Sequence, residues 1–190
     1  MNVPADFSKT KAKGASTNTK RITGGGHVCE ILKAEECFSS TGTSYLAISF
    51  DIKGGEFDGY YRAQYNADRE RKGDEAKWRG VYRQFVLDRD GKCSPYFKGF
   101  IESVERSNPG YKFDGNEKTL AHKMVGLVFR NEPYEGTDGN AYDSYKPCWA
   151  CEANKAAEQK EPKAKAIRQI NGAALKAEPT PNDFDSDLPF

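Results

Sequence analysis

The sequence has no long apolar run and an odd number of cysteines. No stretch of its 190 residues approaches the roughly eighteen apolar residues that a membrane-spanning helix needs. The first ten residues, M-N-V-P-A-D-F-S-K-T, contain no apolar segment typical of a secretion signal. Five cysteines cannot all pair with one another, which argues against a disulfide framework. We therefore expect a cytoplasmic protein without a membrane span.

Signatures of catalysis and of metal binding are also scarce. The sequence contains two histidines, no G-x-S-x-G motif and no paired histidine–carboxylate motif, and its G-G-G-H run at 24–27 lacks the Lys-Ser/Thr of a phosphate loop. Cys148 and Cys151 have the spacing of half a zinc site, which Cys29 and His27 could complete if the first and last strands lie close together. Ordinary reduced cysteines are the simpler interpretation. We expect no metal, no cofactor and no enzymatic activity.

The net charge of +1 hides an uneven distribution of charge along the chain. Residues 1–22 carry five basic side chains and one acidic side chain, whereas residues 183–190 carry three aspartates and no basic residue. Residues 152–182 are rich in Ala, Lys, Glu and Pro, a composition that cannot bury a core. We therefore predict a disordered basic arm (1–22), a folded domain (23–151), a flexible linker (152–182) and an acidic tip (183–190).

The folded domain shows several strand patterns. In residues 45–52 the apolar side chains alternate, with Leu46, Ile48, Phe50 and Ile52 on one face, which predicts a half-buried strand. The same reasoning predicts four more strands, at residues 27–34, 58–66, 123–130 and 141–149.

Helical signals lie between the third and fourth of these strands. Residues 78–88 place apolar side chains at helical spacing. Residues 94–106 begin with Ser94 as N-cap and Pro95 at the first helical position, and N-P-G at 108–110 ends the pattern. Three strands, a helical insertion and two strands are the plan of an OB-fold, a five-stranded barrel in the mainly β, α+β class. Another five-stranded α+β topology would give the same order.

The last eight residues, D-F-D-S-D-L-P-F, carry a resemblance. They resemble the acidic C-terminal tip of bacterial single-stranded-DNA-binding proteins, which ends in Asp-(Leu or Ile)-Pro-Phe. Segments 77–84, 97–101, 107–111 and 126–130 more loosely resemble phage proteins encoded beside replication genes. The resemblance implies a phage or bacterial protein that binds single-stranded DNA during replication, recombination or repair. It also implies that partner enzymes bind the tip, through Asp183, Asp185, Asp187, Leu188, Pro189 and Phe190.

The chemistry of the tip suits such a role. Phe190 offers a ring and, at a free C-terminus, a carboxylate on one residue, which a partner can bind with an apolar slot and basic donors. Pro189 keeps the preceding backbone extended, so that less conformational entropy is lost on docking. The three aspartates would accelerate the encounter with a basic partner surface.

A groove for single-stranded DNA needs cations for phosphates and flat rings for bases. Because one face of residues 45–52 is core, Tyr45 and Ser49 are expected to point outward. The predicted strand at 58–66 would add Tyr60, Arg62 and Gln64 on one of its faces. The candidate phosphate contacts are Lys33, Arg62, Lys123, Arg130 and Lys146. The candidate stacking rings are Tyr45, Tyr60, Tyr65, Trp78 and Trp149, although rings in small barrels are more often packed in the core.

Two other functions fit the same sequence. A recombination mediator or annealing protein would also bind single strands but would accelerate their pairing. A metal-dependent nuclease or an accessory replication enzyme could carry the same docking tip, with Asp51, Asp58 and Asp114 as candidate metal ligands. The sequence leaves the oligomeric state open.

Overall fold

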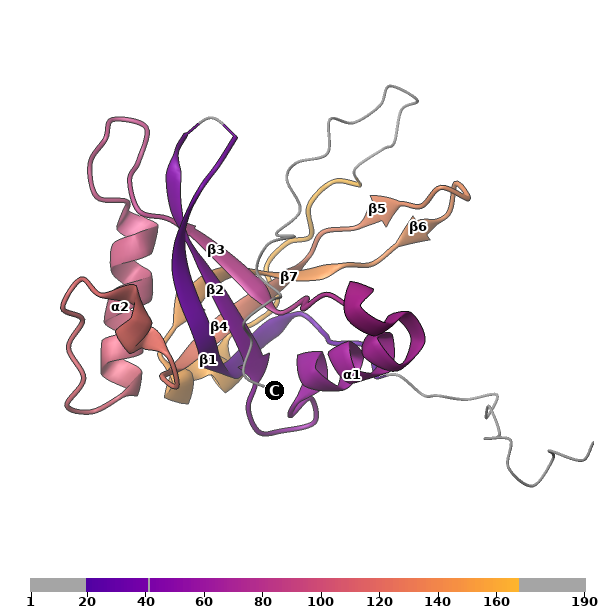
Figure 1. The fold of residues 1–190 in the computed structure, drawn as a ribbon, viewed down its shortest axis with the longest axis horizontal. Coiled ribbons are helices and arrows are strands. Elements are labelled where there is room, and N and C mark those ends of the chain that lie inside the picture. Colours follow the sequence, from indigo (N-terminus) through magenta and orange to yellow (C-terminus); the bar gives the residue numbers. More distant parts are fainter. Residues whose placement is uncertain (1–19, 41, 168–190) are drawn as a thin grey trace, which may run out of the picture.

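Five antiparallel strands form the body of the protein. The computed structural model describes residues 20–40 and 42–167. The strands β1 (Gly25–Phe38), β2 (Ser44–Ile52), β3 (Val81–Phe85), β4 (Met124–Asn131) and β7 (Tyr145–Cys151) pair in the order β3-β2-β1-β4-β7 (Figure 1). The terminal strands of this order, β3 and β7, contact each other and nearly close the sheet into a barrel. This arrangement confirms the mainly β, OB-fold-like architecture.

The helices and a small hairpin are inserted between the barrel strands. Helix α1 (Tyr60–Lys72) and the 3-10 helix η1 (Gly73–Glu75) connect β2 to β3, and α2 (Pro95–Ser107) and η2 (Glu117–Leu120) connect β3 to β4. Two short strands, β5 (Tyr134–Glu135) and β6 (Ala141–Tyr142), form a ribbon between β4 and β7. Figure 1 shows α2 on one side of the barrel and the β5–β6 ribbon projecting from the other. Within the described residues, no helix is both long enough and apolar enough to cross a membrane.

The core confirms two of the predicted elements. Leu46, Ile48, Phe50 and Ile52 of β2 are all buried, as their alternation predicted. Ala47, Ser49 and Asp51 on the other face are buried too, so the expectation of a half-buried strand is wrong. Helix α2 begins at Pro95 after Ser94 and buries one stripe of apolar side chains against the barrel. The stripe consists of Phe100, Ile101 and Val104.

The predicted strand at 58–66 is wrong, because this segment forms most of the first two turns of α1. Its side chains satisfy two periodicities at once: alternation suggests a strand, but Tyr61, Tyr65 and Asp68 also lie on one face of a helix. A distant carboxylate completes the helix, since Asp51 on β2 accepts hydrogen bonds from the backbone N–H groups of Tyr61 and Arg62 at 2.9 and 3.3 Å. These bonds satisfy donors that a helix leaves unpaired at its N-terminus.

The predicted helix over 78–88 is also wrong, because residues 81–85 form β3. Tyr82 and Gln84 are buried inside the barrel, whereas Phe85 on the other face is exposed. Apolar and aromatic residues therefore stand on both faces of this strand. That distribution conceals the alternation on which recognition of a strand from sequence depends.

Residues 152–165, which we call the strap, pack along the barrel, so the folded body extends past the predicted boundary at residue 151. The strap contains the 3-10 helix η3 (Ala153–Glu158), whose Ala156 is buried. The Gly26 N–H donates a hydrogen bond of 3.1 Å to the Gln159 carbonyl. A Cβ atom on Gly26 would lie 2.1 Å from the Ala156 carbonyl oxygen, so close packing of the strap explains this glycine.

Candidate nucleic-acid interface

The outward-facing residues of β1, β2 and β3 lie on the same side of the sheet, although Ala47 and Ser49 of β2 are buried. Residues paired across antiparallel strands project from the same face of a sheet. The register places three residues in each of three rows: Cys37, Tyr45 and Phe85; Glu35, Ala47 and Arg83; Lys33, Ser49 and Val81. We call this surface the strand face. The expected outward direction of Tyr45 and Ser49 agrees with the register, although Ser49 is fully buried beneath its neighbours.

Rings and cations lie together at the open end of the strand face. The ring centroids of Tyr45 and Phe85 are 6.0 Å apart, and Phe85 is 49% exposed. The guanidinium carbon of Arg83 lies 5.4 Å from the centroid of the Tyr45 ring, a cation–π contact. Lys33, two rows away, forms an ion pair of 2.6 Å with Glu35. Rings beside cations are what a sequence-tolerant site for single strands requires.

Helix α1 covers the opposite end of β2 and β3. Asp51 anchors it there: burial raises the pKa of this carboxyl, and hydrogen bonds from the backbone of Tyr61, Ile52 and Arg62 oppose the rise. Tyr61 packs edge-on against Phe50, with ring centroids 5.3 Å apart.

The covering helix changes the interpretation of four predicted site residues. Trp78 is only 3% exposed and donates its indole N–H to the Gly80 carbonyl at 3.1 Å, so burial removes it from the set of displayed rings. Tyr65 packs beside Trp78, with centroids 5.8 Å apart. Tyr60 contacts Tyr61 edge-on, whereas Arg62 is exposed on α1. Of these four, Arg62 remains a candidate phosphate contact.

The β5–β6 ribbon displays a second pair of rings. Tyr134 and Tyr142 lie opposite each other across the ribbon and stack, with centroids 5.8 Å apart and an interplanar angle of 28°. Both rings are exposed. The Tyr142 hydroxyl donates a hydrogen bond of 2.6 Å to Asp138. This bond, with others from Asn140, lowers the pKa of Asp138 to about 2 and ties the turn to the ring pair.

Three predicted residues lie on the strands that lead into the ribbon. Arg130 of β4 is paired in register with Lys146 of β7, so two cations meet at the root of the ribbon. Arg130 also donates to Glu132 at 3.0 Å. Trp149, farther along β7, is 39% exposed.

The remaining predictions fall elsewhere. Lys123 stands over the Tyr111 ring, with its Nζ atom 4.8 Å from the centroid, beside an open pocket at the C-terminal end of α2. It therefore belongs to neither ring cluster. The six residues of the acidic tip lie outside the described residues.

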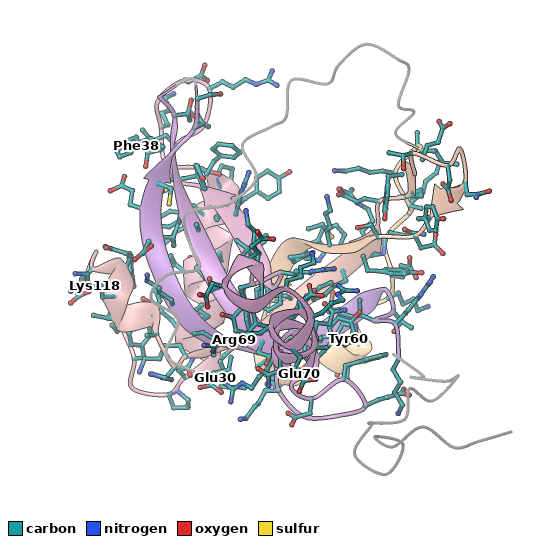
Figure 2. The ribbon with its side chains drawn as sticks, turned by 45° about the vertical axis from the view of Figure 1, so that its right-hand side comes forward. Glu30, Phe38, Tyr60, Arg69, Glu70 and Lys118 are labelled. Atoms are coloured by element: carbon teal, nitrogen blue, oxygen red, sulfur yellow. The ribbon has the colours of Figure 1, made fainter. Side chains whose placement is uncertain are left out.

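Five residues on the strand face, on the ribbon or near the β1–β2 turn were not predicted from the sequence. Phe85 and Arg83 were missed because β3 was mistaken for a helix, and no periodic signal along β3 distinguishes its outward face from its core face. Tyr134 and Tyr142 lie on either side of the segment E-G-T-D-G-N-A, whose Asp-Gly pair is typical of a hairpin turn. Figure 2 shows the fifth, Phe38, near the tip of the β1–β2 hairpin, far from Tyr60 on α1; its side chain is 68% exposed.

The candidate metal ligands are scattered. Asp51 is bonded to the start of α1, Asp58 accepts from the Gly54 N–H, and Asp114 caps a turn at Asn116. Across residues 20–40 and 42–167, no group of three or more His, Cys, Asp and Glu side chains is arranged to hold a metal ion.

The cysteines considered for a zinc site have other surroundings. Cys148 donates its S–H to the Val128 carbonyl at 3.0 Å, and Cys29 is fully buried in the core. Burial raises the pKa of the Cys29, Cys148 and Cys151 thiols, which favours the protonated form over the thiolate that zinc binds.

Comparison with known proteins identifies no relative. The sequence matches no protein-family model, and a search of curated proteins finds no significant match. In OB-folds the face of the second and third strands, together with the loops between strands 1 and 2 and between strands 4 and 5, is the usual place for oligonucleotides. Here these positions correspond to the strand face, the β1–β2 turn and the β5–β6 ribbon.

Proposed function

We propose that the protein binds single-stranded DNA without strong sequence preference during DNA replication, recombination or repair. The observation that carries this proposal is the cluster of Tyr45, Phe85 and Arg83 on the strand face of an OB-like barrel. Single strands expose the faces of their bases, which stack on aromatic rings whatever the base. Duplex DNA hides those faces, so the same surface discriminates against it.

The backbone of the strand would follow the cations beside these rings. Arg83 and Lys33 lie on the strand face itself, and Arg130 and Lys146 lie at the root of the ribbon. Tyr134 and Tyr142 stack on each other and present their outer faces to further bases. The binding surface in this proposal runs from the strand face to the ribbon.

The acidic tip supplies the second half of the proposal. We propose that residues 183–190 bind replication or recombination proteins, with Phe190 as the anchor and the aspartates as the charged rim. The support is the order D-F-D-S-D-L-P-F and the chemistry of a ring beside a carboxylate. The protein then acts by binding and recruitment.

The deciding experiment is fluorescence anisotropy of a labelled oligo-dT, titrated with the full chain and challenged with unlabelled duplex or unlabelled oligo-dT. We expect saturable binding that unlabelled oligo-dT displaces and an equal concentration of duplex does not. Parallel samples with EDTA and with magnesium, run on a denaturing gel, separate binding from cleavage. Equal competition by duplex would overturn the proposal, and metal-dependent loss of oligo-dT would favour the nuclease hypothesis instead.

A further inference from the structure

Three cations near the candidate interface are already paired with carboxylates. On β1, the Lys33 ammonium lies 2.6 Å from Glu35, its neighbour on the same face. At the root of the ribbon, one oxygen of Glu132 accepts from Arg130 at 3.0 Å and from Lys165 of the strap at 2.5 Å. One carboxylate therefore holds one cation, and the other holds two.

The ion pairs of Glu132 with Arg130 and Lys165 are partly buried and lie where a backbone hydrogen bond fixes the strap. The side chains of Arg130 and Glu132 are 24% and 20% exposed, and a backbone hydrogen bond of 3.0 Å from Lys165 to the Asn131 carbonyl fixes the strap beside them. Burial opposes ionisation of Glu132, but hydrogen bonds from Lys165 and Arg130 outweigh it and lower the pKa of this carboxyl. The carboxylate therefore stays charged at neutral pH and keeps both cations paired.

We infer that Glu35 and Glu132 occupy, in the free protein, the positions that DNA phosphates take on binding, and that they thereby limit the electrostatic part of the affinity. This inference rests on the proposed function. Carboxylate and phosphate oxygens accept the same hydrogen bonds from Lys and Arg. A phosphate must displace the carboxylate to reach the cation, and the displaced carboxylate remains close enough to repel it.

The salt dependence of binding measures this competition. Each phosphate neutralised on a single strand contributes about 0.7 to the slope of log affinity against log salt. A cation held by a carboxylate contributes less, because the pair is already neutral. Glu35→Gln removes one carboxylate–cation pair and Glu132→Gln removes two, so we expect the slope to steepen in both variants, by at most about 0.7 and about 1.4 respectively.

Glu102 provides a matched control. It lies on α2 and holds two cations, Lys98 at 3.4 Å and Arg106 at 3.5 Å, as Glu132 does. Helix α2 stands on the side of the barrel away from the β5–β6 ribbon (Figure 1). Glu102→Gln therefore makes the same change of net charge outside the candidate interface and removes two carboxylate–cation pairs, while Arg106 keeps a second ion pair with Glu152 at 3.3 Å.

The test compares the full-length chain with Glu35→Gln, Glu132→Gln and Glu102→Gln in oligo-dT anisotropy across a salt series, after circular dichroism melts confirm folding. We expect Glu35→Gln and Glu132→Gln to bind several-fold more tightly at low salt, with a steeper slope for both and the larger change for Glu132→Gln, and Glu102→Gln to match the unaltered chain. Glu35→Gln does not touch the strap, so it tests the inference even if Glu132→Gln loosens the fold.

The failures of the inference and of the proposed function differ. If the unaltered chain binds oligo-dT but Glu35→Gln and Glu132→Gln leave affinity and slope unchanged, the inference is wrong and the proposed function stands. An equal gain from Glu102→Gln would also overturn it, because net charge alone would then explain the effect. Failure of the unaltered chain to bind oligo-dT would overturn both.

Discussion

The two ends of the β2–β3 pair carry aromatic rings in contrasting surroundings. At one end Tyr61, Tyr65 and Trp78 lie around α1, and Trp78 is almost completely buried. At the other end Tyr45 and Phe85 lie beside Arg83 with no helix across them, and half of Phe85 is exposed. The same residue types are therefore packed around a helix at one end and exposed at the other. The position of α1, and not the number of rings, accounts for this difference in exposure.

The largest expected effect concerns the covered end. Trp78→Ala removes a buried ring between α1 and the barrel, and we expect the free energy of unfolding to fall by about 3–5 kcal/mol. Urea unfolding followed by circular dichroism measures this change. Trp149→Ala, which truncates an exposed ring on β7, is the control and should cost much less. Equal effects of the two substitutions would contradict the contrast between the covered and open ends.

A smaller effect, on binding instead of stability, is expected at the open end. Phe85→Ala removes a displayed ring, and loss of stacking on one base costs about 1–3 kcal/mol, or roughly 5- to 150-fold in affinity for oligo-dT. Unfolding in urea should change little, because the side chain is half exposed already. Leu87→Ala, an exposed apolar side chain nearby without a ring, is the control. If Phe85→Ala bound oligo-dT as tightly as Leu87→Ala, the proposal that bases stack on Phe85 would be wrong.

The smallest effect concerns the ribbon. Because hydrogen bonds from Tyr142 and Asn140 lower the pKa of Asp138 to about 2, the ionised carboxylate stabilises the ribbon above the ordinary aspartate pKa. This stabilisation should be lost as pH falls towards 2. Side-chain NMR signals of Tyr142 followed against pH would show the transition, and Asp138→Asn should abolish it. A midpoint near the ordinary aspartate value, about 4, would show that the bond does not hold in solution.

The order of elements was predictable, although two of the segments were exchanged. Strand β2 and helix α2 were found because each has one apolar face and clear boundaries. Residues 58–66 were taken as a strand and 78–88 as a helix, and the structure has them the other way round. Both the predicted and the observed chain have three strands before α2, so the predicted OB-like architecture agrees with the structure despite the two wrong segments.

The candidate site was predictable in part for a related reason. Tyr45 was found because the alternation of residues 45–52 shows which face is core, and Lys33 was named as a basic residue on a predicted strand. Arg83 and Phe85 were missed because both faces of β3 carry rings, and no periodicity separates a core ring from a displayed one.

Composition and local pattern by themselves determined that the chain forms a small mainly β domain with strand β2 and helix α2, and that its last eight residues carry three aspartates and no basic residue. These properties depend on neighbouring side chains and on their period along the chain. Only the tertiary structure decided which rings are buried and at which position a glycine is needed for the strap to pack closely. Both depend on residues far apart in sequence: Asp51 binds the start of α1, and Gly26 lies beneath Ala156. Such contacts leave no periodic trace in the sequence, because each requires the folded barrel to bring its partners together.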